Sequence, residues 1–176
     1  MSTQTTRGFL IASDAQAKMT LNRMRQKVRQ AVLDHDFVWW ARKELHKLAP
    51  DAFASRNWSQ VARAVRQYVG AHIRFTPDPV GDENLTPPLE HMRMFQNGAT
   101  ILLGDCDDAA TLSAAMAEAV GIPAEFVLRA FYKPDNPYQH VLTVLHPKGG
   151  GAMVSDTTRD AQRLPPVATR EFRMRV

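Results

Sequence analysis

The stretch from residue 107 to residue 120 is the feature that most constrains the fold of this 176-residue chain. It is rich in Ala, Leu and Met, with apolar residues almost all round a helical projection, so it predicts a helix without a solvent face. Gly121 suits the position after the helix end, because glycine accepts a left-handed backbone, and Pro123 blocks continuation. A buried helix needs cover on every side, and the rest of the chain must supply it.

The first half of the chain predicts further helices. Apolar residues recur at helical spacing over residues 15–33, and a second helical stretch, residues 36–48, contains the adjacent pair Trp39 and Trp40. Asn57 is a suitable N-cap for a third helix, which we expect to end before a short extended exit at residues 73–75. A turn-rich stretch, residues 77–88, then leads to a short amphipathic segment over residues 89–95.

The second half of the chain predicts strands. Residues 124–132 and 139–146 have strand patterns separated by a turn, and residues 152–156 form a third short strand. The tail alternates apolar and basic residues from Phe172 to Val176, as a half-buried edge strand does. Helices followed by an antiparallel sheet indicate the α+β class.

Composition excludes several classes of protein. Hydrophobic residues make up 44% and charged residues 23% of the chain, which is typical of a globular domain. No apolar run approaches the ~20 residues that span a membrane, and no export signal is recognisable, so we expect a soluble, non-exported protein without a membrane partner. The single cysteine, Cys106, excludes an intramolecular disulfide and a multi-cysteine zinc site.

Charge is distributed unevenly along the chain. Residues 1–74 hold 13 Lys/Arg against 5 Asp/Glu, whereas residues 75–176 hold 9 against 13. A basic segment attracts nucleic acid or an acidic protein surface. The basic residues nevertheless recur at helical spacing, which favours a solvated helix face, and a nucleic-acid partner is the less favoured interpretation.

The segment that opens the buried helix is Gly104-Asp105-Cys106-Asp107-Asp108. A thiol at a helix N-terminus faces free N–H groups and the positive end of the helix dipole, both of which favour the thiolate, whereas the aspartates oppose it. We expect Asp105 to cap the helix and the other two aspartates to complement its dipole. We expect no metal site here, because a helix start points the three carboxylates in different directions.

Two histidines on one predicted strand are candidate partners for Cys106. His140 and His146 lie ~20 Å apart along the strand, so at most one reaches the thiol. His140 is preferred because it opens the strand beside a turn, and Asp156 at the end of the next strand is placed to accept a hydrogen bond from it. The spacing alone suits a nucleophile, base and orienting group, or ordinary core residues. We expect the other four histidines to be surface or packing residues: His35, His46, His72 and His91.

The order of these motifs resembles the transglutaminase-like cysteine proteinase superfamily. The matching segments are residues 104–127, Gln139-His140-Val141 and residues 154–158. In that family a G-x-C-x-D/E motif starts a helix that ends in G-I-P-A, a histidine opens a later strand, and an aspartate ends the next. The likeness extends over residues 73–158 and is greatest to short bacteriophage and prophage members.

The resemblance implies a papain/transglutaminase-like α+β core at residues 57–176. The helical spacing and basic charge ahead of this core indicate a basic helical N-terminal extension at residues 1–56. The resemblance also implies a catalytic triad of Cys106, His140 and Asp156 that hydrolyses amide, peptide or isopeptide bonds through a thioester, without a cofactor or metal. The substrate would be a protein or peptide, and the protein would act in the host cytoplasm or in the virion.

Other functions remain open beside this one. The same fold can serve as a weakly active or inactive structural protein of a phage particle, which would bind its partner through residues 15–50. Transfer to an amine in place of water would give a cross-link, but small members of the family more often resemble proteases or amidases.

The chain departs from the common family pattern at three places near the triad. An aromatic residue after the histidine, a tryptophan before the aspartate and a glutamine in the proline-rich stretch are replaced by Val141-Leu142, Met153 and Thr86. The Cys106 N–H remains one expected oxyanion donor, and Gln96 and Asn97 are candidates for a side-chain donor.

Overall fold

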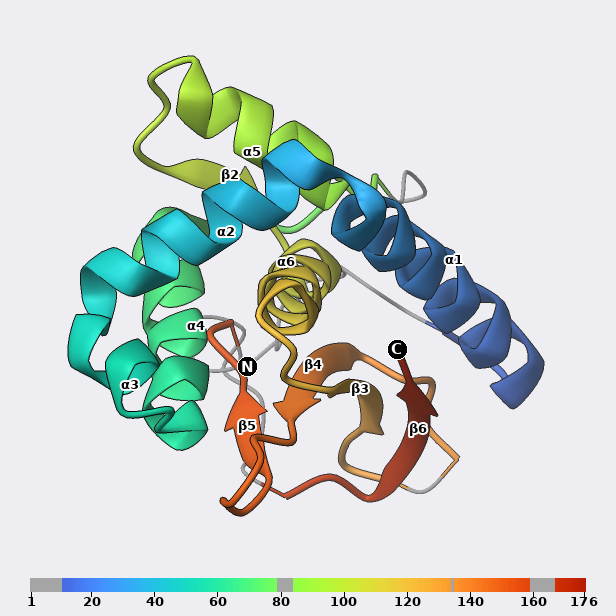
Figure 1. The fold of residues 1–176 in the computed structure, drawn as a ribbon. Coiled ribbons are helices and arrows are strands. Elements are labelled where there is room, and N and C mark those ends of the chain that lie inside the picture. The colour runs from blue at the N-terminus through green and yellow to red at the C-terminus, as the bar shows by residue number, and fades with distance from the viewer. Residues whose placement is uncertain (1–10, 79–83, 134, 159–166) are drawn as a thin grey trace, which may run out of the picture.

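A computed structural model describes residues 11–78, 84–133, 135–158 and 167–176. At its centre lies α6 (Cys106–Ala119), seen end-on in Figure 1 between a group of helices and a sheet. Every residue of α6 except Glu118 is buried, so the predicted helix without a solvent face is confirmed. Gly121 follows with φ 80°, as expected for a glycine after a helix end.

One side of α6 is covered by α1 (Asp14–Leu33), α2 (His35–Leu48), α4 (Trp58–His72) and α5 (Pro88–Gln96) (Figure 1). The short helix α3 (Pro50–Ala54) packs against α2 and α4. The predicted N-cap of α4 is confirmed, because the Asn57 side chain accepts a hydrogen bond from the Gln60 N–H. Helix α3 was not predicted. Its five residues are too few to show a period, although Pro50 suits a first helical position.

The main sheet covers the other side of α6. Its strands are β3 (Ala124–Ala130), β4 (His140–Leu145), β5 (Met153–Ser155) and β6 (Arg170–Arg175), all antiparallel in the order β5-β4-β3-β6. The predicted strands and the edge position of the tail are therefore confirmed. A parallel pair, β1 (Ile73–Phe75) with β2 (Leu102–Gly104), was not predicted as such, and β2 leads directly into the start of α6.

Three contacts fix how α6 lies on the sheet. The Thr143 hydroxyl donates to the Ala110 carbonyl at 2.7 Å, and the hydroxyls of Ser113 and Ser155 lie 3.1 Å apart. Beyond the end of α6, the His146 N–H donates to the Pro123 carbonyl at 2.9 Å. The helix and β4 therefore run in the same direction, and the first turn of α6 lies at the end of the sheet where β4 begins.

The N-terminal helices belong to the same core as α6. The buried face of α1, which includes Leu21, Met24 and Val28, lies in one hydrophobic cluster with Leu112 and Met116 of α6. The division into residues 1–56 and 57–176 stays a prediction. The first ten residues of the chain and positions 79–83 of the turn-rich stretch lie outside the described residues. None of the described helices has the length and hydropathy needed to cross a membrane.

Candidate active site

Cys106 is the first residue of α6 and is 1% exposed. The helix start is held by a capping box, as predicted for Asp105. One Asp105 carboxylate oxygen accepts a hydrogen bond from the Asp107 N–H at 3.0 Å, and Asp108 accepts one from the Asp105 N–H at 3.2 Å. The strand β2 and this box together fix the backbone that presents the thiol.

His140 is the first residue of β4, and its side chain is fully buried. Its Nε2 lies 3.0 Å from Oδ2 of Asp156, the residue that directly follows β5. The second oxygen of this carboxylate accepts a longer hydrogen bond, 3.4 Å, from the Thr158 N–H. The sequence-predicted pairing of His140 with Asp156 is therefore present, and it is made by two adjacent antiparallel strands.

The other ring nitrogen of His140 defines the chemistry that the pair can perform. Nδ1 is buried and has no hydrogen-bond partner among the described residues. When the Nε2–H group donates a hydrogen bond to the Asp156 carboxylate, the imidazole is neutral and Nδ1 carries its lone pair. The carboxylate thus orients the ring so that Nδ1 can accept a proton.

Cys106 and His140 lie at the same end of the contact between α6 and β4, because the helix and the strand run in the same direction. His146 follows the opposite end of β4, where its Nε2 is 3.6 Å from a Glu125 carboxylate oxygen. The strand therefore separates the two histidines as the sequence predicted. The structure places His140, and not His146, at the end of the helix that bears the thiol.

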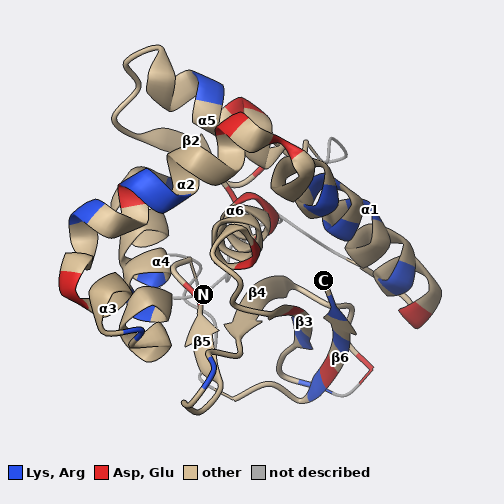
Figure 2. Cartoon of the chain, in the orientation of Figure 1, with Lys and Arg blue, Asp and Glu red and all other residues tan. Residues whose placement is uncertain are grey.

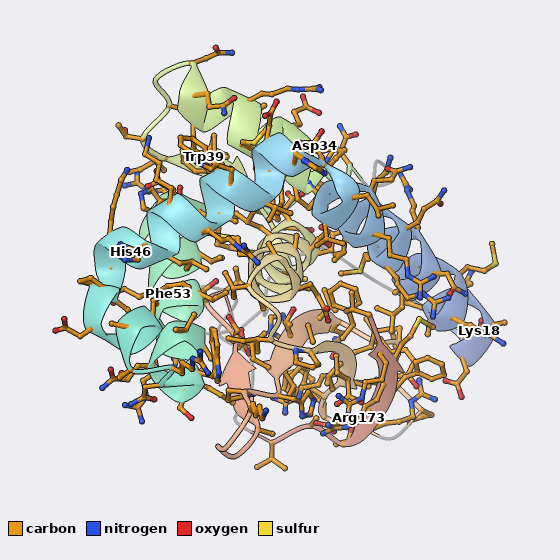
Figure 3. All side chains as sticks on the ribbon, in the orientation of Figure 1. Lys18, Asp34, Trp39, His46, Phe53 and Arg173 are labelled. Carbon is orange, nitrogen blue, oxygen red and sulfur yellow. The ribbon has the colours of Figure 1, made fainter. Side chains whose placement is uncertain are left out.

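The remaining histidines take part in packing or lie at the surface. The His72 ring stacks on Tyr68 with 4.1 Å between ring centroids, and the His46 ring lies 5.6 Å from that of Phe53 (Figure 3). His91 is buried, and burial lowers its pKa to about 4. His35 is exposed at the start of α2.

The three aspartates beside Cys106 form a compact, buried group. One carboxylate oxygen from each of Asp105, Asp107 and Asp108 lies within 4.8 Å of the others. The expectation that they point in different directions is wrong, because the capping box turns Asp105 and Asp108 toward each other. Such oxygens are the ligands that hard divalent cations prefer, and these carboxylates also hold the helix start.

Burial dominates the acidity of this group. It raises the pKa of Asp107 well above the usual range, and the neighbouring aspartates add to the effect. Burial also raises the pKa of Asp108 to about 7, although the hydrogen bond from the Thr86 N–H opposes the change. Thr86 thus contacts the helix start through its backbone N–H.

The two candidates for a side-chain oxyanion donor lie at the end of α5. Gln96 is the last residue of that helix and lines a cavity with Trp39 and His72, whereas Asn97 caps the helix. That cavity shares no described lining residue with a second cavity, described next, which reaches Asp156. The identity of a side-chain donor stays a prediction.

A cavity of about 780 Å³ reaches Asp156. Arg63 and Arg66 of α4 line one side, Arg129 of β3 another, and Thr157 lies next to Asp156. The positions of the basic residues of α4 are blue segments of the cartoon in Figure 2. The sequence predicts that the basic residues of the first half form a solvated helix face, and this prediction does not include a basic cavity. The feature that points to the cavity is the three-residue spacing of Arg63 and Arg66, which puts both on one side of the helix.

Comparison with known proteins gives a family match. The model described as the Transglutaminase-like superfamily matches residues 49–158, more than half of the chain, and this range contains Cys106, His140 and Asp156. The searches of curated proteins and of solved structures gave no match.

Proposed function

Because the chain belongs to the transglutaminase-like superfamily, we propose that it is a cysteine hydrolase of amide or peptide bonds. Cys106 is the nucleophile, His140 the general base and Asp156 the orienting group. The observation that carries the proposal is the His140–Asp156 hydrogen bond, which leaves a buried Nδ1 at the end of the fold where Cys106 starts α6.

The first half of the reaction forms a thioester. His140 Nδ1 takes the Cys106 thiol proton, and the thiolate attacks the substrate carbonyl carbon. The imidazolium is stabilised by the Asp156 carboxylate at 3.0 Å. The resulting tetrahedral oxyanion lies near the N-terminus of α6, where the Cys106 N–H supplies one donor. Collapse breaks the C–N bond, and His140 gives its proton to the departing amine.

The second half of the reaction restores the enzyme. Neutral His140 takes a proton from water, and the hydroxide attacks the thioester carbonyl. The second tetrahedral intermediate releases the carboxylic acid, and the Cys106 thiolate regains its proton from the imidazolium. Peptide, side-chain amide and isopeptide bonds all satisfy this sequence, and an amine in place of water would give a cross-link.

The proposal is tested by mass spectrometry of peptides incubated with the wild type and with Cys106→Ala. We expect wild-type-dependent products that gain one water per cleaved bond, and no product from Cys106→Ala. Products that lose ammonia and join two peptides would identify transfer to an amine instead. Equal turnover by Cys106→Ala would overturn the assignment of the nucleophile.

The second candidate function is a structural or assembly role in a phage particle, with residues 15–50 as the binding surface. It is favoured by large apolar side chains that α1 and α2 leave exposed: Met19 is 72% and Trp39 is 61% exposed. Figure 3 shows Trp39 on the side of α2 toward α5, and the Lys43 ammonium lies 4.8 Å from the centre of its ring. In this case Trp39→Ala would impair particle assembly, whereas Cys106→Ala would not. Either function is compatible with the host cytoplasm or the virion.

A further inference from the structure

We propose that the cavity beside Asp156 binds a carboxylate of the substrate, so that the enzyme selects acidic peptides. This inference rests on the proposed hydrolase function and adds the class of substrate. The cavity, about 780 Å³, is large enough for one or two peptide side chains.

The cavity adjoins the catalytic pair. Asp156, which accepts the hydrogen bond from His140, is part of its lining. Arg129, also in the lining, is paired directly with His140 in the register of β3 and β4. Residues directly opposite each other on antiparallel strands have their side chains on the same face of the sheet. A peptide bound in the cavity therefore lies against the face that carries His140.

The lining of the cavity is positively charged. Arg63 and Arg66 are exposed on adjacent positions of one face of α4, and within the described parts of the chain neither forms an ion pair. Arg129 is held by Glu171, with 2.9 Å between Nε and Oε1. Among the described residues of the lining, Asp156 is the one carboxylate, and it is hydrogen-bonded to His140. Two guanidinium groups are thus available for an anion.

The chemistry favours a carboxylate peptide over a nucleic acid. A guanidinium presents paired N–H donors that match the two oxygens of a carboxylate. No aromatic side chain lines the cavity among the described residues, so nucleobases have no stacking surface. The apolar side chains of Met153 and Val154 offer contact for the remainder of a peptide.

Binding is tested by fluorescence anisotropy with a short glutamate-rich peptide and its glutamine counterpart. Using Cys106→Ala prevents turnover of either peptide. We expect the glutamate peptide to bind at least about tenfold more tightly, and the added change Arg63→Gln/Arg66→Gln to remove most of this preference. The matched control is Arg23→Gln/Arg29→Gln, which removes the same charge from exposed positions on α1, far from α4 (Figure 1). We expect the control to keep the preference.

Three results would overturn the inference: equal binding of the two peptides, equal loss in both double variants, or stronger displacement of the peptide by a DNA oligonucleotide than by free glutamate peptide. Failure of the hydrolase proposal is separable from these. If the glutamate peptide binds through Arg63 and Arg66 but no Cys106-dependent turnover occurs, the binding site stands and the hydrolase fails. If turnover depends on Cys106 but the two arginine changes leave KM unaltered for acidic peptides, the inference alone fails.

Discussion

At the scale of single residues, the two histidines at the opposite ends of β4 show how position decides chemistry. His140 at the start of the strand is fully buried and bonded to Asp156, whereas His146 beyond its end contacts Glu125 and is partly exposed. The sequence was sufficient to choose between them, because strand length separates the two and a turn precedes only His140. It was not sufficient to find Arg63, Arg66 and Arg129 beside Asp156, since that proximity depends on how α4 lies against the sheet.

Asp156→Asn tests the orienting role at this scale. An amide can occupy the same space, but it removes the negative charge that stabilises the imidazolium and it permits the wrong tautomer of His140. We expect Cys106-dependent turnover to fall by roughly 10²-fold or more, with little change in KM. Asp135→Asn, an exposed aspartate in the turn before β4, is the control and should keep full activity. A wild-type rate for Asp156→Asn would remove Asp156 from the mechanism.

His91→Leu tests a buried histidine that the mechanism does not use. Burial lowers the pKa of His91 to about 4, so between about pH 4 and its ordinary pKa near 6.5 the unfolded state binds more protons than the folded state. This residue therefore makes the protein less stable as the pH falls through that range. We expect the variant to be more stable than the wild type at pH 4 by roughly 2–3 kcal/mol, with a smaller difference at pH 7.

The measurement for His91→Leu is the free energy of unfolding by denaturant at several pH values. The quantity to follow is the difference in free energy of unfolding between variant and wild type. The raised pKa of Asp108 gives a pH dependence opposite to that of His91, and because it is present in both proteins it cancels in this difference. Between the ordinary pKa of an aspartate and about 7, Asp108 binds more protons in the folded state than in the unfolded state. Its ionisation therefore makes the protein less stable as the pH rises through this range. A difference between the two proteins that does not vary with pH would contradict the account.

At the scale of elements, α6 was predicted from its own sequence, because a helix that is buried on all sides has apolar residues all round its helical projection. The longer helices and the four strands of the main sheet were likewise found within a few residues of their observed ends. Helix α3 and the β1–β2 pair were not, since elements of three to five residues depend on tertiary contacts. The convergence of the three aspartates was also missed, because it arises from the capping box and not from helix periodicity.

Leu112→Ala tests the central place of α6. The Leu112 side chain is fully buried in the middle of the helix, so truncation removes its apolar contacts and leaves a cavity. We expect a loss of about 2–5 kcal/mol in the free energy of unfolding. Leu103→Ala, at a position that is 66% exposed in β2, should cost much less. Equal effects of the two changes would show that α6 is not the core of the fold.

At the scale of the whole molecule, the N-terminal helices are part of the cover that α6 requires. The buried residues of α1 and α2 lie in one cluster with those of α6, and the Arg42 side chain donates a hydrogen bond to the Ala119 carbonyl. The family match starts at residue 49 and so excludes both helices. Sequence patterns predicted α1 and α2 as helices, but they do not show which face of each helix packs against which neighbour.

A chain restricted to residues 57–176 tests this dependence. Removing α1 and α2 exposes the apolar side of α6, so we expect the fragment to lose cooperative thermal unfolding and to be cleaved rapidly by protease. The full chain with Met19→Ser, an exposed position of α1, is the control for the helix surface and should remain cooperative. A fragment that unfolds cooperatively would establish residues 57–176 as an independent domain.

The central claim is that Cys106 is activated by His140, and the pH dependence of Cys106 alkylation tests it most directly. Iodoacetamide can modify no other thiol in this chain. An ordinary thiol titrates near ~8.5, whereas one paired with histidine titrates several units lower. We predict rapid alkylation below about pH 6 that is lost in His140→Ala and kept in His146→Ala. A titration near ~8.5 in the wild type that His140→Ala leaves unchanged would contradict the account.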